Sequence, residues 1–226
     1  MVVIPYQFKG KDELRKWLWK YLSDYHLTMV PRPCFARVPS FKATHVATAR
    51  LTARPEWQAA DTVVIAPDDV TTEARREAIR QNKRLFVPLP KSERAVLLEK
   101  VDPGQATPAS LMKEIGRFGR EVPLAELKGA PLLITGAVSV DRFGNWLGQG
   151  EIFGELHPSL VRADGILAGA FRVAVVDDMQ IFEDFEYLMD PADAKLDLAV
   201  TKTKAVAPEP RTGPPTAPHT GPILIR

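Results

Sequence analysis

The chain has 226 residues, of which 45% are hydrophobic and 26% are charged, and its formal net charge is +2. The length suits one large domain or two small ones, and the composition supports an ordinary globular core. A net charge this small excludes a strong electrostatic field for DNA or a membrane surface, so we expect neither nucleic acid nor membrane as a partner.

The single cysteine, Cys34, cannot form an internal disulfide, which fits a reducing compartment. The first residues lack the basic start, apolar run and small-residue cleavage site of a secretory signal. No stretch approaches 18 uninterrupted apolar residues, the length that would indicate a membrane-spanning helix. The sequence therefore predicts a cytoplasmic globular protein.

Hydrophobic periodicity predicts helices that alternate with strands along the chain. The first helix, over residues 11–24, has an apolar stripe formed by Leu14, Trp17, Leu18, Tyr21 and Leu22. The remaining predicted elements are helices over residues 41–52, 71–83 and 108–121, and short apolar strands over residues 62–67, 84–90, 130–140, 172–178 and 196–201.

Short strands that are apolar throughout and separated by helices are typical of a parallel sheet with both faces covered. The predicted class is therefore α/β with a mainly parallel sheet.

At about residue 207 the composition changes, and six prolines follow, at positions 208, 210, 214, 215, 218 and 222. Proline fixes φ and lacks a donor, so we expect residues 208–226 to be neither helix nor central strand. This proline-rich arm is predicted either to pack in extended form along the domain of residues 1–207 or to be disordered, and its apolar end favours packing.

A glycine-rich segment follows the strand predicted over residues 130–140. Its glycines stand at positions 144, 148, 150 and 154, and we call residues 144–154 the glycine loop. In open α/β sheets, ligands bind beyond the carboxyl ends of the strands, which is where this loop lies. The spacing G-x-G-x-x-x-G from Gly148 is neither the dinucleotide fingerprint nor a Walker P-loop. The pattern leaves two alternatives: a phosphate-binding loop, or a turn that needs glycine for its geometry alone.

Two cations, Lys11 and Arg15, are spaced i, i+4 on the first predicted helix. On one helix face they repel each other by about a few tenths of a kcal/mol, and an anionic ligand would reverse that cost. The alternative is a solvated helix face.

The four histidines have no metal-ligand spacing, and no G-x-S-x-G sequence indicates a hydrolase.

Five segments, in order, carry a resemblance to a known family. They are "KDELR", "RVPSFKATHVA", "APDDVTTEARREAIRQNKRLFVPLP", the stretch from 134 to 156, and "LDLAVTKTKAVAPEP". The fourth is similar to G-x-x-x-x-x-x-G-x-R-[LI]-G-x-G-x-G-Y-x-D. Over roughly residues 8 to 210 the chain resembles the 5-formyltetrahydrofolate cyclo-ligase (methenyltetrahydrofolate synthetase) family, most closely its methenyltetrahydrofolate synthetase domain-containing branch.

The resemblance implies a three-layer α/β/α Rossmann-like domain of the NagB/RpiA/CoA-transferase type. It also implies an ATP- and Mg²⁺-dependent conversion of 5-formyltetrahydrofolate, or a related formyl-pterin, to the 5,10-methenyl form. In that reaction the formyl oxygen attacks the γ-phosphate, and the N10 amine then displaces phosphate. Catalysis would consist mostly of positioning and charge neutralisation. A reduced folate is the expected small-molecule partner, and we expect a monomer or a homodimer.

The resemblance also assigns expected roles to residues of this sequence. The ATP contacts would be Lys11, Arg15, Trp146, Leu147, Gly148, Gln149 and Gly150. The folate contacts would be Ser40, Phe41, Asp68, Asp69 and Phe153, with the choice between the two aspartates left open. Glu155 would be the metal ligand, and Gly148 and Gly150 would be catalytic. Arg142 is added as a third catalytic candidate from its proximity to Trp146, not from a family motif.

Three residues of the loop depart from the family pattern: Trp146 replaces its arginine, Ile152 a glycine, and Glu155 an aspartate. Tryptophan cannot neutralise a phosphate in transfer. Arg142, four residues before Trp146, would be a substitute cation, or else an ordinary surface arginine. Two hypotheses follow: an ATP-dependent cyclo-ligase, or a non-catalytic nucleotide- or folate-binding protein on the same fold.

Overall fold

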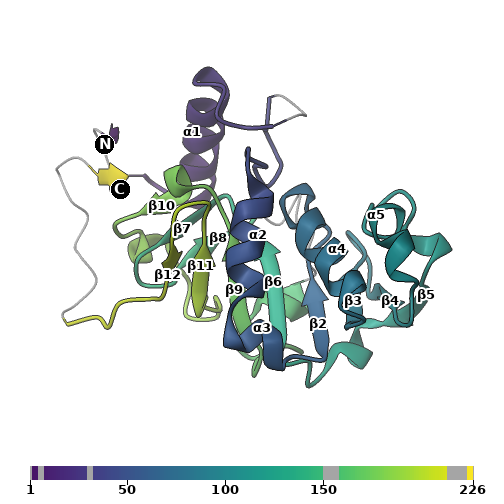
Figure 1. Ribbon diagram of the computed structural model, residues 1–226. Coiled ribbons are helices and arrows are strands. Elements are labelled where there is room, and N and C mark those ends of the chain that lie inside the picture. Colours follow the sequence, from purple (N-terminus) through teal and green to yellow (C-terminus); the bar gives the residue numbers. More distant parts are fainter. Residues whose placement is uncertain (1, 5–7, 30–32, 150–157, 213–222, 226) are drawn as a thin grey trace.

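The protein is represented by a computed structural model that describes residues 2–4, 8–29, 33–149, 158–212 and 223–225 (Figure 1). None of the helices described there is long and apolar enough to cross a membrane. The strands form two sheets, one of eight strands and one of five.

The eight-stranded sheet is the centre of the molecule. Its order is β12 (Ala205–Val206), β11 (Leu198–Val200), β9 (Phe171–Val175), β6 (Leu132–Gly136), β2 (Thr62–Ile65), β3 (Arg84–Pro88), β4 (Arg94–Leu98) and β5 (Arg120–Pro123). The five strands from β11 to β3 run parallel, whereas β12, β4 and β5 pair antiparallel at the two edges. The predicted α/β class with a mainly parallel sheet is confirmed.

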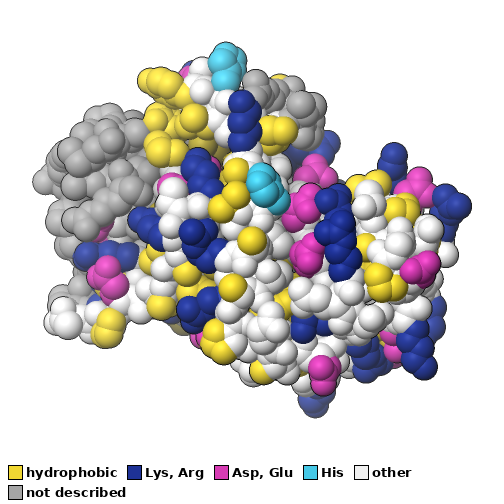
Figure 2. Space-filling model, in the orientation of Figure 1, with side chains coloured by type: hydrophobic (Ala, Val, Ile, Leu, Met, Phe, Trp, Pro, Cys, Tyr) yellow, Lys and Arg dark blue, Asp and Glu magenta, His cyan; other side chains and the backbone are white. Residues whose placement is uncertain are grey.

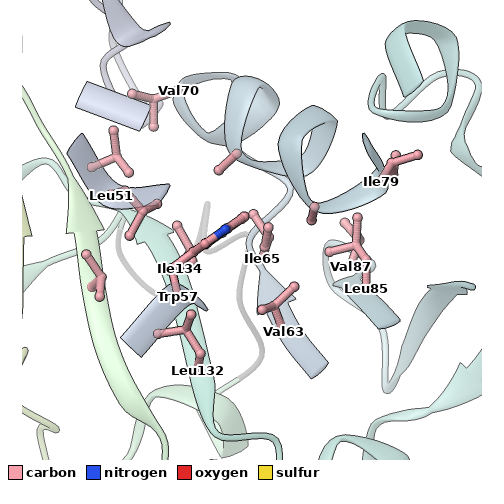
Figure 3. Packing of buried hydrophobic residues seen from close by; sticks show 14 of the residues in the cluster. Leu51, Trp57, Val63, Ile65, Val70, Ile79, Leu85, Val87, Leu132 and Ile134 are labelled. Atoms are coloured by element: carbon pink, nitrogen blue, oxygen red, sulfur yellow. The ribbon is translucent and has the colours of Figure 1, made fainter. Parts of the chain in front are cut away.

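One face of this sheet is covered by α2 (Thr44–Thr52), α3 (Pro55–Ala59), α4 (Thr72–Arg80) and α5 (Ala106–Ala109) (Figure 1). Side chains alternate across the sheet, so Val63 and Ile65 face these helices while Val64 faces away. Trp57 of α3 is fully buried and lies among the strand residues (Figure 3). Its indole N–H donates to Gln81 Oε1 at 2.8 Å, so the large ring is buried with its polar group satisfied.

The opposite face is covered in two parts. Over β2, β3 and β4, apolar residues of the 3₁₀ helix η4 (Leu124–Leu127) and of the segment after α6 (Pro158–Val161) complete a second cluster. Over β9 and β11 lies the five-stranded sheet, in the order β1 (Val2–Ile4), β13 (Ile223–Ile225), β10 (Ile181–Phe182), β7 (Ser139–Asp141) and β8 (Trp146–Leu147). Val140 and Trp146 pack against Ala174 of β9.

Helix α1 (Lys11–Asp24) packs on the outer side of the five-stranded sheet, where Leu14 and Leu18 meet Leu147 and Phe182. The helix has the bounds that its apolar stripe predicts. Figure 2 shows hydrophobic side chains gathered over the upper part of α1, whereas Lys, Arg, Asp and Glu are interspersed near α4 and β3–β5.

The predicted helix over residues 108–121 is wrong. That segment contains the end of α5, the 3₁₀ helix η3 (Ile115–Arg117) and the edge strand β5. A Cβ atom at Gly119 would lie 2.5 Å from Val96 Cγ1 and 2.6 Å from the Leu97 carbonyl oxygen. The glycine therefore allows the close approach to β4 that turns the chain into the sheet. The sequence analysis also missed β4 itself.

Two other boundaries differ from the prediction. The strand predicted over residues 130–140 is two strands, β6 and β7, which belong to different sheets. In the C-terminal arm, β13 is flanked by β1 and β10, so the prediction that the arm contains no internal strand is wrong. The reason is that the prolines end at Pro222, and Ile223–Ile225 keeps its backbone donors.

Candidate functional site

Three of the five motif segments meet at Gly136, the last residue of β6. Its N–H donates to Asp68 Oδ2 at 3.0 Å. A Cβ atom at this position would collide with Val38 Cγ1 and lie 2.6 Å from Val70 Cγ1. The carboxyl end of the sheet thus joins residues 37–47, residues 66–90 and the segment that leads to the glycine loop.

Of the two candidate aspartates, Asp68 lies inside this junction. It is 4% exposed, whereas Asp69 is exposed at the start of the 3₁₀ helix η1 (Asp69–Thr71). The buried guanidinium of Arg75 donates to the carbonyl oxygens of Ala66 at 2.6 Å and Asp68 at 3.0 Å, which fixes the turn after β2. The folate contact of either aspartate stays a prediction.

The glycine loop begins in the turn of a hairpin formed by β7 and β8. Gly144 has φ +83°, and a Cβ there would lie 2.7 Å from the Leu196 carbonyl oxygen, so both conformation and space favour glycine. Asp141 closes the turn from within. Burial raises the pKa of its carboxyl, although hydrogen bonds from Asn145, Phe185 and Phe143 act in the opposite direction.

Helix α1 brings one predicted phosphate cation to the loop. Arg15 is 9% exposed, and its Nε donates to the Gly148 carbonyl oxygen at 2.8 Å. One terminal nitrogen of Arg15 donates to Asp12 Oδ1 at 2.6 Å, one turn earlier. Leu147 packs against α1 beside this contact. The structure thus brings together the helix cation and the loop, while the binding of phosphate by Arg15 stays a prediction.

The other predicted cation, Lys11, is held by two carboxylates. Its Nζ donates to Asp190 Oδ2 at 2.7 Å and to Asp193 Oδ2 at 2.6 Å. Burial by itself lowers the pKa of Lys11, but the hydrogen bonds and charges of the two aspartates outweigh burial and raise it. The sequence analysis missed both aspartates, because a pair of carboxylates spaced by three in a proline-containing turn has no signature of its own.

Trp146 and Leu147 point to opposite sides of the hairpin. Trp146 is 9% exposed and packs between the two sheets, with Nε1 donating to the Ala194 carbonyl oxygen at 2.8 Å. Because an indole has a single donor, none remains for a phosphate. Gln149 is 6% exposed. The ATP contacts of Trp146, Leu147 and Gln149 stay predictions.

Arg142, the predicted substitute cation, lies among carboxylates. Arg142 Nη1 lies 3.5 Å from Glu183 Oε2 and 3.5 Å from Glu209 Oε2. The guanidinium lies 4.7 Å from the centre of the Phe143 ring. The charge of Arg142 is therefore compensated where it stands. A catalytic role for Arg142 stays a prediction.

The remaining predicted residues divide into two groups. Phe41 is 3% exposed in the core under α2, and Ser40 is half-buried, with its carbonyl oxygen accepting the Met29 N–H at 2.7 Å. Gly150, Phe153 and Glu155 lie outside the described residues, as does Ile152.

The fifth motif contains β11, and its residues after that strand lie at the carboxyl edge of the sheet. The hydroxyls of Thr201 and Thr203 both donate to Asp178 Oδ1 at 2.6 Å. Within the motif, Asp197 Oδ2 accepts the Arg172 N–H at 2.7 Å. The threonine contacts join the segments that follow β9 and β11 at the carboxyl edge, whereas Asp197 joins the starts of the same two strands at the opposite edge.

In the part of the chain that the structure describes, no three His, Cys, Asp or Glu side chains are grouped closely enough to hold a metal ion. Mg²⁺ is usually held by one or two carboxylates together with substrate phosphates and water, so a larger protein cage is not required. The fit of Mg²⁺ to this site depends on Glu155, whose role stays a prediction.

The fold and the site define an α/β protein in which a buried cation, Arg15, donates to the Gly148 carbonyl oxygen of the glycine loop. The model of the 5-formyltetrahydrofolate cyclo-ligase family matches residues 8–202, and the chain belongs to this family.

Two curated relatives are similar to this chain in sequence, and one solved structure is similar to it in fold. The methenyltetrahydrofolate synthase domain-containing proteins of Bos taurus and Mus musculus are 25% and 26% identical over 204 residues, which is 87% of this chain but 53% and 55% of theirs. The chain therefore spans about half the length of the curated relatives it matches. The NMR structure of Aquifex aeolicus 5,10-methenyltetrahydrofolate synthetase aligns with a TM-score of 0.54 at 17% identity, over 90% of this chain and 97% of that one. This likeness supports the fold.

Proposed function

We propose that the chain is an ATP-dependent ligase that converts 5-formyltetrahydrofolate, or a related formyl-pterin, to the 5,10-methenyl form by phosphorylation of the formyl oxygen. Family membership supports the reaction class. The observation that carries the proposal is the contact between Arg15 and the Gly148 carbonyl oxygen, which holds a buried cation against the glycine loop.

In this proposal the residues act mainly by positioning and by charge. Arg15 and Lys11 would face the phosphates of ATP. Asp190 and Asp193 would neutralise the Lys11 ammonium until an anionic ligand binds. Without these two carboxylates, the ammonium would be partly desolvated and would have no counter-charge. Mg²⁺, held by the phosphates and Glu155, would neutralise charge on the transferring group. Asp68 would contact the pterin.

A second candidate is a nucleotide- or folate-binding protein that no longer turns over its ligands. The observation in its favour is Trp146, which is buried, has its single donor engaged by Ala194, and replaces an arginine of the family pattern. Loss of a cation that stabilises a transferring phosphoryl group typically costs about 4 kcal/mol or more of transition-state stabilisation.

Mixing the protein with Mg-ATP and 5-formyltetrahydrofolate, and following the near-ultraviolet absorbance of the methenyl product, separates the two candidates. Product formation supports the ligase. Calorimetric binding of ATP or folate without product at high protein concentration contradicts it and favours the binding protein. A Trp146→Arg variant that gains no activity would show that tryptophan alone does not silence the site.

We also propose a cytoplasmic location. The support for this location is that Cys34 is the single cysteine of the sequence, which fits a reducing compartment. Detection of the tagged full-length protein in the cytosolic fraction of its host would support this location, and its exclusion from that fraction would contradict it.

A further inference from the structure

Asp141, the last residue of β7, is a buried carboxylate with four hydrogen-bond donors around it. It is 5% exposed. Its Oδ1 accepts the N–H groups of Phe143 and Asn145, both at 2.9 Å. Its Oδ2 accepts the side-chain amide of Asn145 at 2.8 Å and the N–H of Phe185 at 3.0 Å. A carboxylate has about four acceptor sites, so this one is fully used in joining the hairpin turn to the segment after β10.

These bonds enclose the turn that sets the register of the hairpin. The Asp141 N–H donates to the Asn145 carbonyl oxygen at 2.9 Å, and the strands then pair Val140 with Trp146 and Ser139 with Leu147. In this register Trp146 faces the space between the sheets and Leu147 faces α1.

A slip of one residue would exchange the two faces of β8. Trp146 would then meet the α1 layer, and its indole would leave the Ala194 carbonyl oxygen that it binds at 2.8 Å. Backbone carbonyls alternate in direction along a strand, so the Gly148 carbonyl oxygen would also turn away from Arg15.

We infer that Asp141 is a positioning residue that fixes the β7–β8 register and, through it, the contact between Gly148 and Arg15. It acts through the hairpin and does not itself touch a ligand. Its effect on nucleotide binding rests on the proposed function, whereas its effect on the register does not.

Hydrogen exchange of the Trp146 indole N–H tests the register without any ligand. In Asp141→Asn one acceptor oxygen becomes an NH₂ group that faces other donors, so the indole proton should exchange at least about tenfold faster than in the wild type. Trp146→Phe identifies its resonance. The matched control is Asp177→Asn, which changes another buried aspartate that accepts a backbone N–H, from Met179 at 3.1 Å, and should leave this proton protected.

Asn145→Ala keeps the carboxylate and removes one bond to Oδ2, so it should accelerate the same exchange by a smaller factor. It also carries the test if Asp141→Asn does not fold. Wild-type protection of the indole in every folded variant would overturn the inference, and so would equal acceleration in Asp177→Asn.

Binding of Mg-ATP by calorimetry tests the second step. Asp141→Asn and Arg15→Gln should each raise the Kd by at least about tenfold, and the double variant should be little weaker than either, because both remove one shared contact. Effects that multiply in the double variant would overturn the link to Arg15. If the wild type binds no Mg-ATP, the proposed function fails, and the exchange experiment alone decides the role of Asp141.

Discussion

Two tryptophans illustrate how differently two regions of this molecule are held together. Trp57 is fully buried in the layer between the helices and the central sheet, among aliphatic residues of β2 and β6 (Figure 3). Trp146 lies between the two sheets in the β7–β8 hairpin, whose buried polar residues Asp141 and Asn145 bond to each other. On the outer side of the hairpin, Arg15 of α1 donates to the Gly148 carbonyl oxygen. The helix-covered core depends on volume, which many apolar residues can supply. The hairpin depends on directional bonds, which few substitutions can replace.

The largest effect expected is in the helix-covered core. Trp57→Ala removes a large buried ring and should lower the free energy of unfolding by about 3–5 kcal/mol, because the transfer and cavity terms add. Urea unfolding measures this value. A loss below about 1 kcal/mol would contradict the central place of Trp57 in that layer.

A smaller effect is expected at the junction between the two regions. Gly136→Ala places a methyl group against Val38 and Val70, and this overpacking should cost about 1–3 kcal/mol. The matched control is Gly116→Ala, where a Cβ would have no atom within 4 Å and should change stability by less than about 0.5 kcal/mol. Equal values for the two variants in chemical denaturation would refute the crowding at Gly136.

The hairpin should respond to the loss of a single bond. Trp146→Phe retains most of the apolar volume but leaves the Ala194 carbonyl oxygen without its donor, which should cost about 1 kcal/mol. Thermal and urea unfolding measure the change. A variant as stable as the wild type would mean that the hairpin, like the core, depends on volume alone.

The smallest effect concerns the pair of Lys11 and Asp190 at the surface. The hydrogen bond and charge of Lys11 lower the pKa of Asp190 below 3.8, so this pair stabilises the fold above that pH and the contribution is lost as the pH falls through the lowered pKa. Asp190→Asn should therefore lower Tm slightly at pH 7, and the difference from the wild type should vanish in acid. Asp69→Asn, at an exposed carboxylate with no ion pair in the described part of the chain, is the control. A difference that persists in acid would contradict this origin.

The sequence predicted the helix-covered core better than the hairpin, and the reason is physical. The apolar runs of β2, β3, β6, β9 and β11, which form this core, are visible without tertiary structure. The periodic stripe of α1 is visible in the same way, although α1 packs on the five-stranded sheet. Gly119 and Gly136 are required by close approach between segments far apart in the sequence, which no local pattern reveals. The split of residues 130–140 between two sheets has the same origin.

The candidate site was predicted in part for a similar reason. Family motifs indicated Arg15 and Gly148 separately, and the structure joins them at 2.8 Å. They gave no indication of Asp190 and Asp193, which lie 179 and 182 residues from Lys11 in the sequence and bind it in space. They also could not decide between Asp68 and Asp69, because burial distinguishes two neighbouring aspartates and composition does not.

The central claim is that the contact between α1 and the glycine loop is a phosphate site. Calorimetry of Mg-ATP with the wild type, Arg15→Gln and Lys16→Gln tests it most directly, because Lys16 is an exposed cation on the same helix. We expect Arg15→Gln to weaken binding by about tenfold to a hundredfold, from the loss of hydrogen bonds to a charged group. Lys16→Gln should bind as the wild type does. Equal weakening by both variants, or unchanged binding in Arg15→Gln, would contradict the claim.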